Sequence, residues 1–299
     1  MNRKKFFAVL MMCIVTAAIF AGCGDDKKSD DDKYFIKIGM LKYMNVGEQQ
    51  FSDIMQKLVE TFSLNVTPHK VIFFDNLNSM QMAFNSGQID EISTYNCVAN
   101  YLAARKANVT VLENHISGFD DEFCLAMRED DKDLYNQVNE VVKQMKADGT
   151  LADFQKKYID DSVSDKEPEA VEIEKFEGAD TIKVAVTGDL PPLDLILADG
   201  TPTGFNTAVL SEIGKRLQKN IELIQIESAA RAAALESKRV DISFWAIVPI
   251  SDIIPADVDK PEGIILSTSY YTGKVVHIGW NDGSNSSTGL GDMVQGVSQ

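Results

Sequence analysis

The sequence of 299 residues has few of the side chains that build metal sites and disulfide frameworks. It contains four cysteines and three histidines. His69, His115 and His277 occur singly, and no two of them have the spacing of metal ligands. The sequence therefore gives no reason to expect a metal ion or another cofactor.

Basic residues are also scarce. Lysine and arginine total 29 against 45 aspartates and glutamates, so the formal net charge is −16. Nucleic acids and anionic lipid surfaces attract basic proteins, and this balance argues against both as partners. It does not identify a ligand, because local charge in a cleft can oppose the net charge.

One apolar run stands at the start of the chain. Three basic residues precede residues 6–21, which are apolar but too few to span a membrane comfortably. The run ends in Ala-Gly-Cys, which resembles a lipobox with Cys23 as the acylated residue, although Phe20 departs from the usual Leu. We expect residues 1–22 to be a lipoprotein signal peptide; the alternative is an uncleaved anchor helix. Both place the body of the protein outside the cytoplasm.

Two segments contain too few apolar residues to fold by themselves. Residues 23–33 are acidic and read as a flexible tether, and residues 282–299 read as a disordered tail. Between them, a chain that is 44% hydrophobic can fill the cores of two modest domains.

Cys97 and Cys124 remain outside the leader. Disulfides persist in exported proteins, but free cysteine is itself a common core residue, so a disulfide and two buried thiols are both open. Cys97 follows a predicted strand and Cys124 lies in a later one, which makes an oxidised pair the testable prediction.

Strand and helix signals alternate from 34 to 159, the predicted first lobe. A helix with Phe51, Ile54, Met55 and Leu58 on one face begins after a capping box at Asn45. A βαβαβ order implies a mostly parallel sheet flanked by helices. The predicted strands cover 35–41, 71–74, 89–93, 109–112 and 122–128, and further helices begin with a cap at Asn76 or Asn78, near Asn96 and near Asp131.

The second half repeats this organisation. An acidic stretch, 160–178, reads as the linker to a second lobe at 179–281. Residues 83–90 parallel residues 234–241, a weak internal repeat that indicates two similar α/β lobes. The predicted strands cover 182–187, 221–226 and 240–248, and the helices 207–217 and 229–236.

Two motifs carry a resemblance to one family. The stretch 181–205 is similar to the opening of the family 3 bacterial extracellular solute-binding proteins, with Leu193 and Asn206 as departures. The stretch 123–158 is similar to the end of the same family, with Tyr158 in place of Trp. The matching residues are Gly188, Asp189, Pro191, Pro192, Asp194, Asp199, Gly200, Gly204 and Phe205, and then Arg128, Asp131, Leu134, Asn139, Lys146, Asp148, Gly149, Thr150 and Lys157.

The order of these motifs is reversed, because the family's end precedes its opening. Either the chain is a permuted clamshell or it holds two truncated tandem modules. We favour the permuted clamshell, since each half supplies one βαβαβ unit and the pair supplies one cleft. The resemblance thus implies an α/β fold with two lobes of the periplasmic-binding-protein type.

The same resemblance implies a function. We expect a protein lipid-anchored to the cell membrane on its extracytoplasmic side, which captures a small polar solute for the permease of an ABC transporter. A dehydratase or cell-wall lytic enzyme and a non-transport sensor are the alternatives. We expect no enzyme, because neither a Ser-His-Asp nor a Cys-His constellation is visible.

The solute class stays open. Amino-acid binders of this family carry a T-x-x-R motif, and the corresponding stretch 249–263 contains no arginine. The aspartate that usually binds the ligand's ammonium aligns with Tyr95. Amino-acid transport is the family's implication, yet both charge anchors are missing.

Ligand contacts in such a fold lie at the carboxyl ends of strands. We predict Asp189 and Arg231 as polar anchors and Trp245 as a stacking wall, although Trp245 is as well suited to a core. Closure about a hinge near 160–178 is expected. The other candidates are Asp194 beside Asp189, and Asn76 and Tyr95 from the first lobe.

Overall fold

The computed structural model describes residues 36–61, 68–112, 120–162 and 168–281. From Ile36 onward these residues belong to one compact unit. The predictions for the signal peptide, Cys23, the tether and the tail fall outside the described residues. Among the residues that the structure describes, no helix combines the length and the apolar character needed to cross a bilayer.

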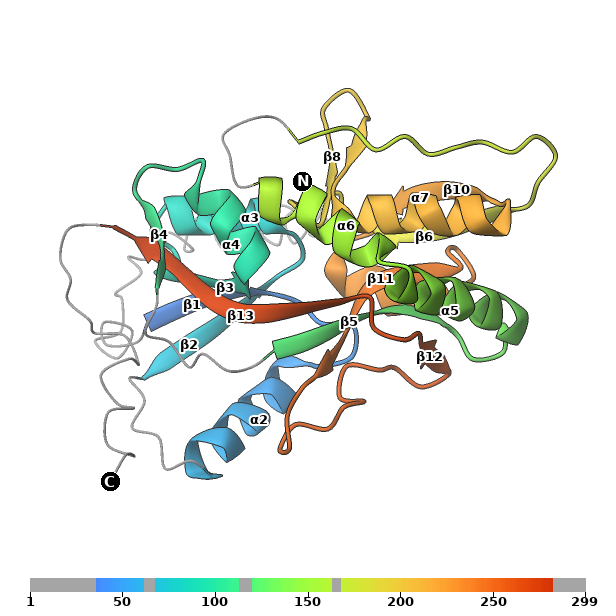
Figure 1. Ribbon diagram of the computed structural model, residues 1–299. Helices are drawn as coiled ribbons and strands as arrows, with labels where there is room; N and C mark the ends of the chain where they lie inside the picture. The colour runs from blue at the N-terminus through green and yellow to red at the C-terminus, as the bar shows by residue number, and fades with distance from the viewer. Residues whose placement is uncertain (1–35, 62–67, 113–119, 163–167, 282–299) are drawn as a thin grey trace, which may run out of the picture. The chain divides into compact units, whose positions relative to one another are not determined.

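The first sheet has a parallel core in the order β2-β1-β3. Two further strands, β13 and β4, continue it in antiparallel pairing. We call these strands with their helices the small lobe (Figure 1). Its elements are β1 (Ile36–Leu41), α2 (Glu48–Thr61), β2 (His69–Phe74), α3 (Leu77–Asn85), β3 (Glu91–Tyr95), α4 (Asn96–Ala103) and β4 (Val109–Leu112).

The second sheet has the parallel order β10-β6-β11, which antiparallel β5 and β12 extend. We call it, with its helices, the large lobe. A small sheet, β7-β8-β9, follows β6. The elements are β5 (Asp120–Arg128), α5 (Lys132–Ala147), α6 (Thr150–Tyr158), β6 (Thr181–Val186), β7 (Asp189–Leu190), β8 (Asp194–Ile196), β9 (Pro202–Thr203), α7 (Phe205–Leu217), β10 (Asn220–Gln225), α8 (Arg231–Glu236), β11 (Ile242–Pro249) and β12 (Ile264–Leu266).

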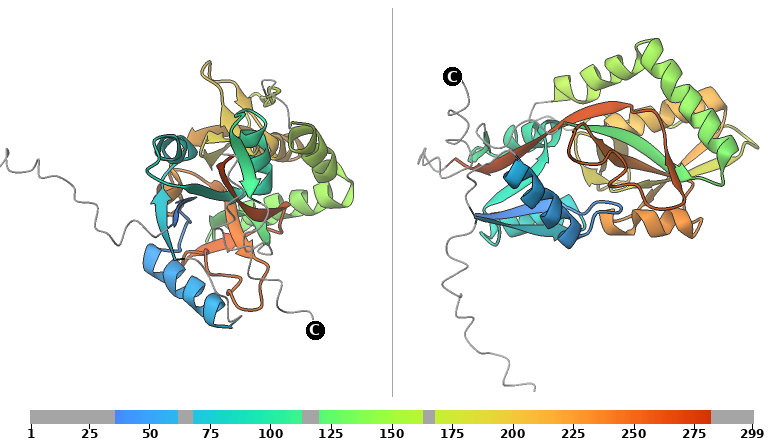
Figure 2. Two further views of the ribbon diagram at one scale, coloured as in Figure 1. Left: turned by 90° about the vertical axis from the view of Figure 1, so that its left-hand side faces the viewer. Right: turned by 90° about the horizontal axis from the view of Figure 1, so that it is seen from below.

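One strand joins the lobes. The first residues of β13 (Tyr271–Trp280) pair with β5 in the large lobe, and from Val275 onward β13 pairs with β3 in the small lobe. Figures 1 and 2 show it as a single long strand that crosses from one sheet to the other. The predicted α/β two-lobed architecture is confirmed, and shared strands favour a permuted clamshell over two truncated modules.

The lobes do not follow the halves expected from the sequence. The expected first lobe, 34–159, includes β5, but β5 lies beside β11 and its register runs from Met127 opposite Ile242 to Asp121 opposite Pro249. The expected second lobe, 179–281, includes β13, which completes the sheet of the small lobe. Each half of the sequence therefore contributes one strand to the sheet of the other half. β5 completes the edge at β11, and β13 completes the edge at β3.

The stretch 160–178 is not a hinge between lobes. The elements on both sides of it, α6 and β6, belong to the large lobe, and α6 packs against α7. Val171 N donates to Pro202 O at 2.9 Å, and Phe176 N donates to Asn220 Oδ1 at 2.9 Å. Residues 168–178 are thus bound along the large lobe, and among the described elements β13 is the one that pairs with strands of both lobes.

The predicted disulfide is wrong for this structure, in which Cys97 and Cys124 are free, buried thiols. Successive strand residues face opposite sides of a sheet. In β5, Phe123 and Leu125 point into the large apolar cluster that contains Cys97, so Cys124 between them points away from it. Burial raises the pKa of Cys97 to about 11, although a hydrogen bond with Tyr271 opposes this shift.

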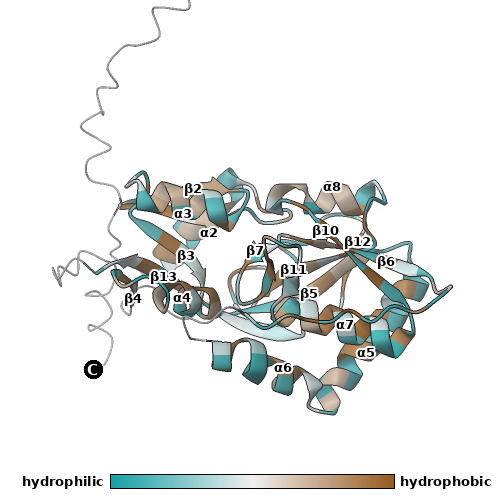
Figure 3. Cartoon of the chain, turned by 90° about the horizontal axis from the view of Figure 1, so that it is seen from above, coloured by the Kyte–Doolittle hydropathy of each residue, from teal (hydrophilic) through white to brown (hydrophobic). Residues whose placement is uncertain are grey.

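Hydrophobic residues are frequent along the strands of both lobes, whereas helices such as α5 and α6 carry hydrophilic as well as hydrophobic residues (Figure 3). The main cluster continues from the small lobe through β5 into the large lobe and includes Phe84, Phe123 and Phe205, each almost fully buried. The apolar core is therefore continuous from one lobe to the other.

Candidate functional site

Two aromatic side chains from different lobes meet where β3 and β11 approach each other. The rings of Tyr95 and Trp245 lie 6.2 Å apart in an edge-to-face arrangement. Tyr95 Oη donates to Asp121 Oδ2 at 2.8 Å, which fixes its ring. With Tyr43, these rings line a hollow of about 30 Å³ between the lobes.

Trp245 has an unusual backbone. Its φ is 62°, in the left-handed region that disfavours bulky residues, and the register of β11 against β5 shifts between Ser243 and Ala246. This bulge directs the indole at the interlobe hollow, although the side chain is 5% exposed. Trp245 is therefore both buried and a wall of the hollow. Its Nε1 has no hydrogen-bond partner among the described residues.

Arg231, the first residue of α8, supports the bulge. Nη1 donates to Trp245 O at 2.7 Å and Phe244 O at 3.2 Å, and Nε donates to Ser228 O at 3.1 Å. The guanidinium carbon lies 4.7 Å from the Trp245 ring centroid. Burial lowers the pKa of Arg231, and nearby Asp259 opposes this shift. Arg231 thus holds Trp245 from within the large lobe.

Hydrogen bonds connect the two lobes directly. Asp259 Oδ1 accepts from Asn45 N at 2.8 Å, and Asn45 Nδ2 donates to Val258 O at 3.1 Å. Asp189 Oδ2 accepts from Asn78 N at 2.9 Å in the first turn of α3, where the helix dipole favours a carboxylate. These contacts hold the lobes together around the hollow.

Asn76 and Asp194 have local roles. Asn76 caps α3, with its Oδ1 accepting from Ser79 N at 2.8 Å, so of the two caps that the sequence allows, Asn76 and Asn78, the structure has the first. Asp194 accepts from Gly188 N at 2.6 Å and from Thr187 Oγ1 at 3.1 Å, so its carboxylate fixes the turn before β7. Burial raises the pKa of Asp194 to about 7.

The structure thus brings Tyr95, Trp245 and Arg231 into one contiguous group. Asp189 and Asn76 meet at the amino end of α3 instead, and Asp194 lies in the turn behind them.

Sequence reasoning missed two buried carboxylates. Asp121 is 5% exposed, and burial raises its pKa to about 6 against the effect of the Tyr95 hydrogen bond. Asp259 is 1% exposed; burial raises its pKa while Arg231 lowers it, and its Oδ2 has no partner among the described residues. Both stand in acid-rich stretches that read as solvated surface. No sequence signal distinguished them.

Within the described part of the chain, no group of three or more potential metal ligands converges. The parallel cores, the crossing strand and the aromatic hollow define a two-lobed α/β protein of the periplasmic-binding type. The model for bacterial extracellular solute-binding proteins, family 3, matches residues 29–161 and 182–250, more than half of the chain. The chain belongs to this family.

Solved structures with this fold cover most of the chain at low identity. The ligand-binding component of an ABC-type import system from Staphylococcus aureus, solved with zinc bound, is 14% identical, with a TM-score of 0.43 over 83% of this chain and 66% of that one. The GluR0 ligand-binding core from Nostoc punctiforme in complex with L-glutamate is 9% identical, with a TM-score of 0.37 over 83% and 85%.

The reduced OxyR regulatory domain from a Pseudomonas species is 13% identical, with a TM-score of 0.38 over 82% of this chain and 88% of that one. Comparison with curated proteins gives no match.

Proposed function

We propose that this protein captures a small polar solute between its small and large lobes and presents it to the permease of an ABC transporter, held at the membrane by a lipid on Cys23. Membership of the solute-binding family carries the proposal. The aromatic hollow between the lobes supports it, because solute sites combine apolar walls with a few polar groups.

Two polar atoms offer contacts to a solute, one on Trp245, which lines the hollow, and one on Asp259, whose other carboxylate oxygen accepts from Asn45 across the lobes. Trp245 Nε1 is a donor and Asp259 Oδ2 an acceptor, and neither has a partner among the described residues. Buried polar atoms are normally hydrogen-bonded, so these two are the natural contacts for a bound polar compound. Arg231, with its protein carbonyl partners, acts by positioning Trp245.

Solute entry requires the lobes to separate. A hollow of about 30 Å³ has room for about one water molecule. Separation breaks the Asn45–Asp259 and Asn78–Asp189 hydrogen bonds, and a bound solute would replace their contribution by touching both lobes. The missing carboxylate-binding arginine argues for a solute other than a standard α-amino acid.

A thermal-shift screen against amino acids, polyamines, organic acids and sugars tests the proposal. A true ligand at a hundredfold excess over its Kd stabilises the protein by roughly 2.7 kcal/mol. With a ligand identified, calorimetry on Trp245→Ala should show a loss of about tenfold or more in affinity. Trp280→Ala, which removes a half-exposed ring outside the hollow, is the matched control. Equal affinity in both variants would place the solute elsewhere.

Small-angle scattering tests the closing contacts. The double variant Asp189→Ala, Asp259→Ala should have a larger radius of gyration than the parent, because two interlobe hydrogen bonds are lost. Asp252→Ala removes an exposed carboxylate from the loop that also contains Asp259 and should leave the radius unchanged. A double variant as compact as the parent would show that these bonds do not hold the lobes together.

The lipid anchor has its own test. Palmitate labelling in a bacterial host should mark the parent chain and be lost in Cys23→Ala. If Cys23→Ala keeps its label and its membrane retention, the lipoprotein interpretation is wrong, while solute binding is unaffected.

A non-transport sensor on the same scaffold is the second candidate. It is favoured by the engagement of Arg231 with backbone carbonyls and by the small volume of the hollow. A gene for a permease beside this one would support transport. A full solute screen without any stabilising compound would support the sensor.

A further inference from the structure

A second cavity, of about 140 Å³, lies between α2, the sheet of the small lobe and a wall of the large lobe formed by Ile247, Pro249, Ile254 and Val258. Phe51, Ile54, Met55 and Leu58 line it from the helix, and Ile38 and Met40 line it from β1. The sequence predicts these four helix residues to share one apolar face. The structure shows that this face covers a space as well as a sheet.

The helix is held away from the sheet at its first turns. The Phe51 ring lies 5.5 Å from that of Phe73 on β2 and 6.1 Å from that of Tyr43. Three rings thus fill one end of the gap. Beyond them Ile54 and Met55 are half-buried, whereas Leu58, one turn further, is 2% exposed.

This cavity borders the interlobe hollow without coinciding with it. Met40, Tyr43, Ser93 and Val275 line both spaces. Trp245 and Tyr95 line the hollow but do not line the larger cavity. A compound beneath α2 would therefore contact residues of both lobes, but not the pair Tyr95 and Trp245 that walls the hollow.

One buried carboxylate faces this largely apolar space. Asp121 lines the cavity from β5 while its Oδ2 accepts the Tyr95 hydroxyl. A buried carboxylate gains most from a charged donor, because charge-assisted hydrogen bonds are about twice as strong as neutral ones. The Ser93 hydroxyl and the imidazoles of His69 and His277 are further polar groups that line the cavity, and His277 Nδ1 lies 2.8 Å from Glu91 Oε2.

We infer that this cavity is a second binding site, which takes a compact apolar compound with one amine facing Asp121. An apolar protein cavity of about 150 Å³ binds benzene, so the volume here suits a single ring or a short branched chain. The amine satisfies the carboxylate, and the ring replaces missing packing contacts beneath α2. This site is additional to the proposed solute site at Tyr95 and Trp245, which it adjoins through shared lining residues.

Methyl NMR of the chain labelled at its methionines tests the inference with two probes that share a benzyl group, benzylamine and toluene. Met40 and Met55 line the cavity, whereas Met82 on α3 is 72% exposed and serves as the internal reference. Both probes should shift the Met40 and Met55 signals and leave Met82 unchanged. Benzylamine should bind about tenfold more tightly than toluene, because it adds a charge-assisted hydrogen bond.

Three variants make the test specific. Ile54→Trp fills the cavity and should abolish both sets of shifts, whereas Ser52→Trp places the same indole on the exposed side of α2 and should preserve them. Asp121→Asn keeps an acceptor for Tyr95 and should reduce benzylamine to the affinity of toluene. Unshifted Met40 and Met55 signals at saturating probe, or equal shifts in Ile54→Trp, would overturn the site. Equal benzylamine affinity in Asp121→Asn would overturn the role of the carboxylate.

Discussion

The two lobes contain the same pair of reciprocal hydrogen bonds between a lysine backbone and an aspartate on neighbouring segments of the parallel sheet, which we call the lock. In the small lobe, Lys37 N donates to Asp90 Oδ2 at 2.8 Å, and Asp90 N donates back to Lys37 O at 2.8 Å. In the large lobe, Lys183 N donates to Asp241 Oδ2 at 2.9 Å, and Asp241 N donates to Lys183 O at 2.7 Å. The weak repeat in the sequence thus corresponds to equivalent structure.

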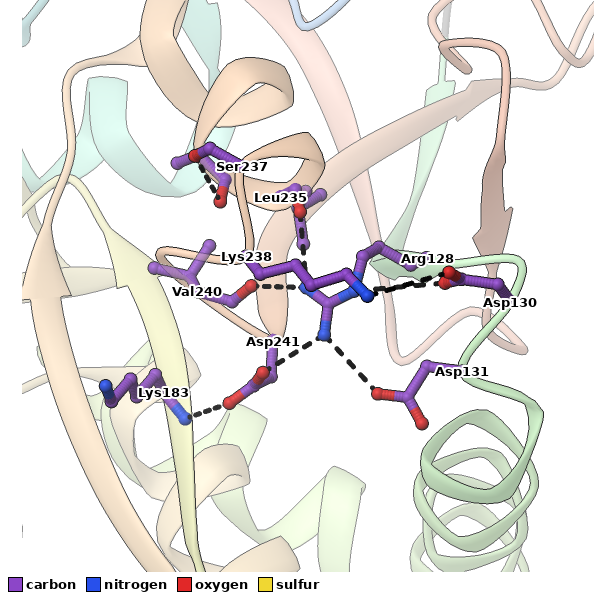
Figure 4. A network of polar contacts seen from close by, with 10 residues as sticks. Arg128, Asp130, Asp131, Lys183, Leu235, Ser237, Lys238, Val240 and Asp241 are labelled. Carbon is purple, nitrogen blue, oxygen red and sulfur yellow. Dashed lines mark hydrogen bonds and ion pairs between the residues drawn. The ribbon is translucent and has the colours of Figure 1, made fainter.

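The lobes differ in what else the aspartate binds. Asp241 Oδ1 also accepts from Arg128 Nη2 at 3.1 Å, and Arg128 Nη1 donates to Val240 O and Leu235 O (Figure 4). Within the described part of the chain, Asp90 has no ionic partner of this kind. The large lobe therefore uses the repeated lock to hold β5, a strand from the other half of the sequence.

The largest expected effect comes from removing this arginine. Arg128→Ala leaves two carbonyls and a carboxylate without their donor, and we expect it to lower the free energy of unfolding by about 3 kcal/mol. Urea denaturation measures this. The control is Arg239→Ala, at an exposed position just before Val240, which should change stability by less than about 0.5 kcal/mol. Similar values for both would mean that the Arg128 network does not stabilise the large lobe.

The second prediction concerns pH and the β7-β8-β9 hairpin that follows β6 in the large lobe. Burial raises the pKa of Asp194 from its ordinary value of 3.8 to about 7. Between these values the folded state retains a proton that the unfolded state has lost, so stability falls as pH rises from 4 to 7. In Asp194→Asn, the loss of stability between pH 4 and 7 should be roughly 2 kcal/mol smaller than in the parent, as measured by denaturation at each pH. A profile parallel to that of the parent would show that Asp194 is charged in the fold.

The third prediction compares the two locks directly. Asp241→Ala should lower the free energy of unfolding by about 2 kcal/mol, because it also leaves Arg128 without this carboxylate partner. Asp90→Ala should lower it by about 1 kcal/mol. The double variant Arg128→Ala, Asp241→Ala should cost less than the sum of its single changes. Additive losses would mean that the two side chains act independently.

The smallest effect is expected at the turn before each lock. Gly87 has a φ of 72° in the small lobe and Lys238 a φ of 58° in the large lobe. Gly87→Ala should cost about 1 kcal/mol, because a side chain disfavours the left-handed conformation. Lys238→Gly should change stability by less than about 0.5 kcal/mol, since relief of strain offsets the added freedom of the unfolded chain. Equal losses in both variants, by thermal unfolding, would contradict this account.

Local signals predicted most of the elements of both lobes. The Asn76 cap and the apolar periodicity of α2 were read correctly because they depend on neighbours within one or two turns. The exchange of β5 and β13 was missed because strand pairing over more than a hundred residues leaves no local pattern. One signal was present in β13: a Cβ at Gly273 would lie 2.8 Å from Tyr95 Cδ1, so glycine permits that close approach.

The candidate site was predicted in part for the same reason. Tyr95 and Trp245 follow apolar strand signals, and the expectation that strand ends converge brought them together. The carboxylates Asp121 and Asp259 owe their burial to segments from other parts of the chain, which composition does not reveal. The cavity beneath α2 could not be foreseen, because periodicity reports which side chains share a face and not how closely the helix packs.

The long strand β13 also constrains the order in which this protein can fold. The small lobe is encoded first, yet β3 acquires its partner in β13 only after nearly the whole chain has been made. Until then β3 presents a free edge, which is prone to pair with other chains. Contacts between segments so far apart in sequence also slow folding. Export before folding would protect such a chain, since both lobes could then assemble together with β13 already present.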